Sequence, residues 1–203
     1  MTATHSHRRR AAVPGDVGGG YAAIARPWWA WWPAVLGLGL GVSPIVTKNS
    51  SVAAAATPLM LATAGYAVIA FSRRPSWSWP LVGGLVVIHL AGRGLGLPGW
   101  VAITAMVGLT VLLGALLRRW GPPPEAMRWQ VRGALVFMGA AVASFFVSSD
   151  VGRVVVAVFL LLHGAWDVVH WRLRAVVSRT LAEWCAVLDV TLGLGILLLT
   201  ALG

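Results

Sequence analysis

The sequence predicts an all-α polytopic integral membrane protein, a bundle of seven transmembrane helices. The 203-residue chain is 58% hydrophobic and only 11% charged, whereas a soluble domain carries about 25% charged residues. Its mean hydropathy is +0.79, and its apolar residues gather into segments of the length that a membrane-spanning helix needs. This composition excludes a soluble enzyme, a disordered protein and a disulfide-rich secreted module.

The chain divides into a polar tail and one apolar domain. Residues 1–26 are rich in glycine and arginine without apolar periodicity, so they are expected to form a flexible cytoplasmic tail. Residues 27–203 are expected to form a single transmembrane domain. Its apolar segments are 28–47, 52–71, 77–97, 98–117, 130–149, 151–171 and 181–202. Lipid cannot satisfy exposed backbone polar groups, so each segment should be a helix.

Two features mark individual helices. Tryptophans open the first and third segments, where their amphipathic rings are expected at the depth of the lipid head groups. Gly37 and Gly41 have the spacing that lets two membrane helices approach closely. The same glycine-rich character would allow a second copy of the chain to pack against an exposed face, so a homo-oligomer is one expected partner besides the membrane lipids.

The distribution of basic residues predicts the orientation. With the N-terminus inside, thirteen of the sixteen basic residues fall on the inner side. The other three, Lys48, Arg93 and Arg153, fall on the outer side. Because basic residues accumulate in cytoplasmic loops, we expect the N-terminus inside and the C-terminus outside, in a multi-pass protein of the plasma (inner) membrane. The net charge of +10 is thereby explained by topology, and no nucleic-acid partner is expected.

The few ionisable residues within the spans are the candidate site. His163, Asp167 and His170 lie on the sixth segment at spacings i, i+4 and i+7, which places them within about 60° of one another on one helix face. The seventh segment carries Glu183 and Asp189. Ionisable groups within a membrane are costly and usually face the interior of the bundle or a water-filled cavity.

Depth in the membrane predicts which of these residues meet. The sixth and seventh segments should be antiparallel neighbours, because a short inner loop joins them. His163 and Asp189 then lie at similar depth, and His170 and Glu183 both lie near the inner interface. Contacts within each of these two pairs are therefore expected. His89 lies near the middle of the third segment.

One interpretation of these residues is a metal site. His163, Asp167 and His170 would be the ligands, with His89 or Asp189 completing the shell. Imidazole and carboxylate groups suit zinc, iron or copper, and an open coordination position would suit hydrolysis or oxidation of a lipid-phase or small-molecule substrate. Asp189 and Glu183 would then take catalytic roles as proton-transfer partners.

Two other interpretations are open at this stage. The same groups could form the proton relay of a small proton-coupled transporter. They could also form a buried hydrogen-bond network that fixes helix packing in a non-catalytic membrane subunit.

Two parts of the sequence resemble known families. The segment VLDVTLG, Val187 to Gly193, resembles the last helix of microbial rhodopsins, in which an Asp precedes the retinal-binding Lys by four positions. Here Gly193 stands four positions after Asp189, and the only lysine is Lys48. No retinal Schiff base is therefore expected.

The second resemblance is one of architecture. A seven-helix plan with the N-terminus inside and intramembrane His and Asp is similar to the membrane-embedded metal hydrolases that include ceramidases and adiponectin-type receptors. It implies a metal site whose ligands come from more than one helix, and the ligands available here are His89, His163, Asp167 and His170. Their order along the chain departs from the pattern of that superfamily.

Overall fold

The computed structural model describes residues 27–98, 101, 103–105, 107–108 and 125–202. Within these residues all regular secondary structure is helical, which confirms the all-α class. Five helical stretches are long and apolar enough to cross a membrane. They are Trp29–Thr47, Val52–Ser72, Trp129–Phe146, Ser149–Leu173 and Arg179–Ala201. The predicted tail, 1–26, and most of the predicted fourth segment, 98–117, lie outside the described residues.

The first predicted segment is interrupted. It consists of a 3₁₀ turn, η1 (Trp28–Trp31), followed by α1 (Trp32–Gly41) and α2 (Ser43–Thr47). Pro44 explains the break, since proline has no N–H to continue the helical hydrogen-bond ladder and its ring collides with the preceding turn. α2 ends at Thr47, and the next residue, Lys48, adopts a left-handed conformation with φ of 50°.

The remaining helices follow the apolar segments more closely. α3 spans Val52–Ser72, and its N-terminus is capped by the Ser51 hydroxyl, which accepts a hydrogen bond from the Ala54 N–H. The predicted third segment, 77–97, begins at the last residue of the 3₁₀ turn η2 (Pro75–Trp77) and contains α4 (Ser78–Gly94), 17 residues long. The later elements are α6 (Glu125–Ala143), η3 (Ser144–Phe146), α7 (Ser149–Leu173) and α8 (Arg179–Ala201).

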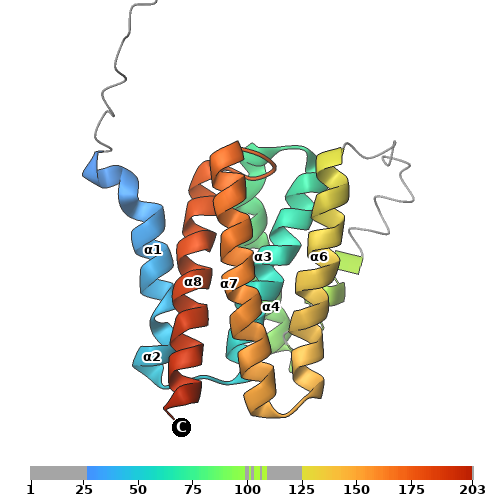
Figure 1. Ribbon diagram of the computed structural model, residues 1–203. Coiled ribbons are helices and arrows are strands. Elements are labelled where there is room, and N and C mark those ends of the chain that lie inside the picture. Colours follow the sequence, from blue (N-terminus) through green and yellow to red (C-terminus); the bar gives the residue numbers. More distant parts are fainter. Residues whose placement is uncertain (1–26, 99–100, 102, 106, 109–124, 203) are drawn as a thin grey trace, which may run out of the picture.

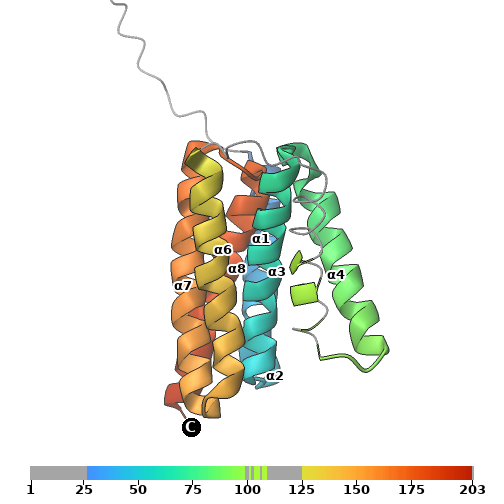
Figure 2. The same cartoon turned by 90° about the vertical axis from the view of Figure 1, so that its right-hand side faces the viewer.

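α3 lies between α4 and the helices α6 and α7. Figure 1 shows α1, α8, α7 and α6 side by side, and Figure 2 shows α4 on the opposite side of α3 from α7. α8 packs between α1 and α7, while α3 packs against α4, α6, α7 and α8. The interior surrounded by α3, α6, α7 and α8 is therefore where buried side chains from several helices can meet.

Glycines set the spacing of α8 from its two neighbours. A Cβ atom at Gly37 would lie 3.1 Å from the Leu188 backbone nitrogen, and one at Gly41 would lie 2.8 Å from Thr191 Cβ. The close approach predicted from these two glycines is thus confirmed. On the other side of α8, a Cβ atom at Gly193 would lie 2.9 Å from the Ala157 carbonyl oxygen of α7. These contacts bring the α7 and α8 backbones close together.

Candidate functional site

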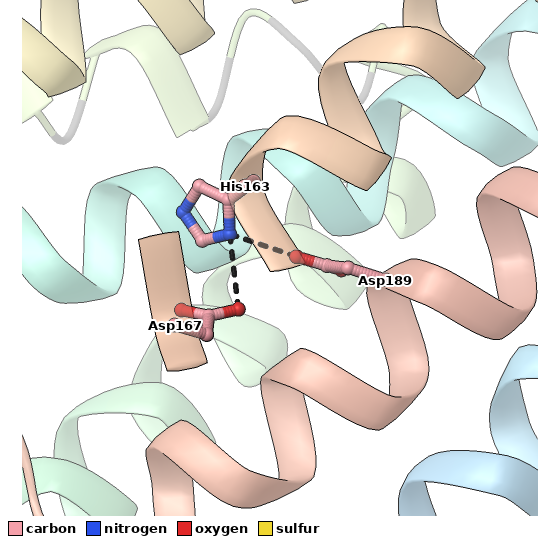
Figure 3. Close-up of side chains that lie close together, drawn as sticks. All are labelled: His163, Asp167 and Asp189. Carbon is pink, nitrogen blue, oxygen red and sulfur yellow. Dashed lines mark hydrogen bonds and ion pairs between the residues drawn. The ribbon is translucent and has the colours of Figure 1, made fainter. Parts of the chain in front are cut away.

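Three ionisable side chains meet between α7 and α8. His163 and Asp167 come from α7 and Asp189 from α8 (Figure 3). His163 Nδ1 lies 2.7 Å from Asp189 Oδ2 and 3.3 Å from Asp167 Oδ2. All three side chains are at most 1% exposed. The predicted contact between His163 and Asp189 is therefore confirmed, and we call these three residues the His–Asp cluster.

Local geometry explains why these residues converge. His163 and Asp167 are one helical turn apart, and helical side chains lean toward the N-terminus, so the Asp167 carboxylate reaches back to His163. Asp189 reaches them across the interface, where Gly164 packs against Val190 and Gly193 packs against Ala157.

Aromatic rings hold His163 in place. Tyr66 of α3 meets the imidazole edge to face, with ring centroids 5.5 Å apart, and Phe137 of α6 does the same at 4.8 Å. Such contacts stabilise one ring orientation. The ring is thereby held with Nδ1 toward both aspartates.

The polar groups of the His–Asp cluster are incompletely satisfied. Asp167 Oδ1, Asp167 Oδ2, Asp189 Oδ1 and the Tyr66 hydroxyl have no hydrogen-bond partner of normal geometry among the described residues. Buried polar groups nearly always have such partners. Two buried carboxylates beside a single imidazole also leave a net negative charge unless a proton or a bound cation compensates it. The arrangement therefore has the properties of a cation site.

His170 lies apart from the cluster. It is seven residues beyond His163, which is about 10.5 Å along the helix axis. Its Nδ1–H donates to the Trp166 carbonyl oxygen at 2.8 Å, and its Nε2 accepts from the Gln130 side-chain amide at 2.5 Å. Both ring nitrogens are thus engaged in contacts outside the His–Asp cluster.

Two other predicted residues also lie outside the cluster. His89 is buried on α4, which packs on α3, and it lines a separate cavity together with Arg93. Glu183 is half-buried on α8, six residues before Asp189 and therefore about 9 Å from it along the axis. Metal ligation by His170 or His89 and catalysis by Glu183 remain predictions that this geometry does not test.

Sequence reasoning missed two residues around the site. Tyr66 is one of only two tyrosines and sits in an alanine-rich span, where an isolated hydroxyl is a recognisable signal. Gln130 is the only glutamine, near the start of a span. Which residues Tyr66 and Gln130 contact depends on which faces of α3 and α6 point toward α7, and no local sequence pattern specifies these faces.

Comparison with protein-family models, with curated proteins and with solved structures finds no match for this chain. The chemistry must therefore be argued from the His–Asp cluster itself. One imidazole and two carboxylates can ligate a divalent cation, or they can exchange a proton among themselves.

Proposed function

We propose that this chain is a multi-pass membrane protein that binds one divalent metal ion at His163, Asp167 and Asp189 and acts on a lipid-phase substrate. One observation carries the proposal. Potential ligand atoms of the three buried residues all lie within 4.8 Å of one another, while three of their four carboxylate oxygens lack a hydrogen-bond partner of normal geometry among the described residues.

The donor set suits zinc, iron or copper. Zinc binds imidazole nitrogen and carboxylate oxygen at about 2.0–2.2 Å, which separates tetrahedral ligands by about 3.3 Å. The two separations from His163 Nδ1, 2.7 and 3.3 Å, are of this order. His163, Asp167 and Asp189 would hold the metal ion, and a proton on His163 Nδ1 would compete with it, because metal ligands must be deprotonated.

Three protein ligands leave one tetrahedral position for a substrate. A bound metal ion supplies Lewis acidity, which polarises a carbonyl or similar oxygen. Asp189 is the protein group best placed to assist as a base, because its Oδ2 faces His163 while its Oδ1 has no hydrogen-bond partner of normal geometry in the described part of the chain.

We also propose seven spans, with the N-terminus inside, in the plasma membrane. α4 ends at the opposite end of the bundle from the start of α6 (Figure 2), which supports an odd number of crossings between these two helices. With α4 counted as a span, one further crossing gives seven. The basic residues at the ends of the described helices support the orientation, because Arg73, Arg74, Arg172, Arg174 and Arg179 lie at one end.

A second candidate function is proton-coupled transport. The hydrogen bond between His163 and Asp189 couples two titratable groups on different helices, as a proton relay requires. A purely structural network is disfavoured, because such a network stabilises packing when its members are fully satisfied. Transport predicts that Asp167→Asn alters pH-dependent flux without changing the metal content.

The test is metal analysis of protein purified in lipid nanodiscs after supply of zinc or iron. His163→Gln and Asp167→Asn should lose most of the metal. His89→Gln and His170→Gln are matched controls, because each removes a buried histidine outside the His–Asp cluster, and both should retain about one ion per chain. A wild-type protein without stoichiometric metal would overturn the proposal, as would equal loss in cluster and control variants.

A further inference from the structure

A cavity lies directly beside the His–Asp cluster. It has a volume of about 330 Å³ and is lined by residues of α1, α2, α3, α4 and α8. This volume is at the lower end of the range for small-molecule sites. Most of the lining is apolar, with Leu61, Leu181, Leu188 and Leu192 among the lining residues. The cavity therefore suits a hydrocarbon rather than a polar metabolite.

The cavity extends along α8. Its α8 wall runs from Leu181 to Leu192, which is about 16 Å along the helix. At the end where α8 begins, Trp79 packs against Trp32 with ring centroids 5.2 Å apart and against Trp184 at 5.4 Å. Trp79 Nε1–H also donates to Thr180 Oγ1 at 3.1 Å. A chain-like molecule would fit along this part of α8, beside Trp184, which lines the cavity.

Some exposed residues that line the cavity are apolar, whereas Ser43, Thr47 and Asn49 line it beside the end of α2. Leu40 of α1 is 48% exposed and Val86 of α4 is 37% exposed, and both line the cavity. α1 packs mainly on α8, whereas α4 packs on α3, so the two helices flank the cavity from different sides. An apolar molecule could enter from the bilayer without crossing water.

The cavity also reaches the free polar groups of the site. Asp189 and Tyr66 both line it, and they are 0% and 3% exposed. Asp189 Oδ1 and the Tyr66 hydroxyl lack hydrogen-bond partners of normal geometry among the described residues. Asp189 thus belongs to both the cavity and the His–Asp cluster, since its other oxygen, Oδ2, contacts His163.

We propose that this cavity binds a single-chain, lipid-phase alcohol, whose hydroxyl donates to Asp189 Oδ1. A carboxylate only accepts hydrogen bonds, so its partner must be a donor. A hydroxyl meets this need at a lower desolvation cost than a charged amine would pay in an apolar cavity. As a statement about substrate class the inference rests on the proposed metal-dependent function, although binding of the alcohol does not itself require the metal.

The experiment is photo-crosslinking in nanodiscs with a diazirine-bearing dodecanol. Labelled peptides should map to α8 between Leu181 and Leu192. Unlabelled dodecanol should compete about tenfold better than dodecane, because dodecane lacks the hydrogen-bond donor. In Asp189→Leu this preference should disappear. Equal competition by dodecanol and dodecane in the wild type would overturn the proposal.

A cavity-filling variant provides the second arm. Ala62 lines this cavity, and Ala62→Phe should reduce labelling of α8 by about tenfold or more. Ala134 lines a different cavity, of about 240 Å³, beside α6, so Ala134→Phe is the matched control and should label like the wild type. Wild-type labelling of Ala62→Phe would overturn the proposal, as would an equal loss in both variants.

Metal analysis of the same samples separates this inference from the proposed function. Normal metal content in Ala62→Phe, together with lost labelling, assigns the loss to the cavity. Alcohol-selective labelling of a wild-type protein that holds no metal would support the cavity and overturn the metal site. Metal binding without alcohol-selective labelling would support the metal site and overturn the cavity proposal.

Discussion

His163 Nδ1 on α7 lies 2.7 Å from Asp189 Oδ2 on α8, and both side chains are fully buried. The contact joins the two helices at the depth where Gly164 and Gly193 let their backbones approach. It therefore has a structural role as well as a chemical one, and the two roles can be measured separately.

The first prediction concerns the energy of this contact. A double-mutant cycle with His163→Ala and Asp189→Ala should give a coupling free energy of about 1–2 kcal/mol, the upper range for polar pairs in membrane helices. Unfolding would be followed in mixed micelles with metal chelated, so that the pair alone is measured. A cycle of His163→Ala with Glu183→Ala is the control and should give a value near zero. Zero coupling for the first cycle would show that the contact has no net energetic value.

The second prediction concerns metal and pH. A metal that binds only the folded state stabilises it by about 2.7 kcal/mol when its free concentration is about 100 times Kd. Chelation should therefore lower the Tm of the wild type at neutral pH. Metal ligands must be deprotonated to bind, so the effect of chelation should grow from acidic to neutral pH.

The control for this prediction is His163→Gln, whose Tm should not respond to the chelator at any pH. His170→Gln should respond like the wild type, since His170 bonds to Trp166 and Gln130 instead of joining the cluster. Thermal unfolding in nanodiscs across a pH series measures both. A chelator effect that persists in His163→Gln would show that the metal binds elsewhere.

The third prediction concerns the glycines between α7 and α8. Gly193→Ala places a methyl group 2.9 Å from the Ala157 carbonyl oxygen, and because backbone cannot move aside cheaply, the free energy of unfolding should fall by about 1–3 kcal/mol. Gly139→Ala is the matched control, because nothing lies within 4 Å of its added Cβ. That variant should be neutral or more stable by up to about 1 kcal/mol, from helix propensity. Equal effects of the two changes would contradict tight packing at Gly193.

The length and hydropathy of the apolar segments predicted the bounds of the uninterrupted helices well. The segment 52–71 corresponds to α3 (Val52–Ser72), and 181–202 corresponds to α8 (Arg179–Ala201). The segment 28–47 corresponds to the candidate span Trp29–Thr47, but hydropathy did not predict the break between α1 and α2 beside Pro44. Average hydropathy indicates whether a segment can lie in lipid, but it does not depend on the backbone N–H that proline lacks.

Part of the candidate site was predictable from helix geometry alone. Depth matching paired His163 with Asp189, because rise per residue is fixed. The shared helix face also predicted His170 beside His163, and metal ligation by His170 remains a prediction. Rotation of α6 and α3, which brings Gln130 to His170 and Tyr66 to His163, depends on tertiary packing that spacing alone does not encode.

The last prediction concerns topology and can decide whether α4 spans the membrane. Single cysteines would be introduced into a Cys185→Ala background, since Cys185 is the only native cysteine and is buried. Suitable exposed positions between helices are Asn49, Ser76, Leu97 and Ser148. In right-side-out vesicles, a membrane-impermeant maleimide should label the cysteines at 49, 97 and 148 and spare the one at 76, because seven spans with the N-terminus inside alternate in that order.

The cysteine at Leu97 is the decisive one. A five-span arrangement, in which neither α4 nor the segment 98–117 crosses, leaves positions 49, 76 and 148 on the same sides as before but moves position 97 to the inner side. Labelling at 97 therefore separates seven spans from five, whereas the other three positions test the overall orientation. Permeabilised vesicles are the control, because every cysteine should then react. A cysteine at 97 that reacts only after permeabilisation would contradict the span at α4, and reversal at the other positions would contradict the inside N-terminus.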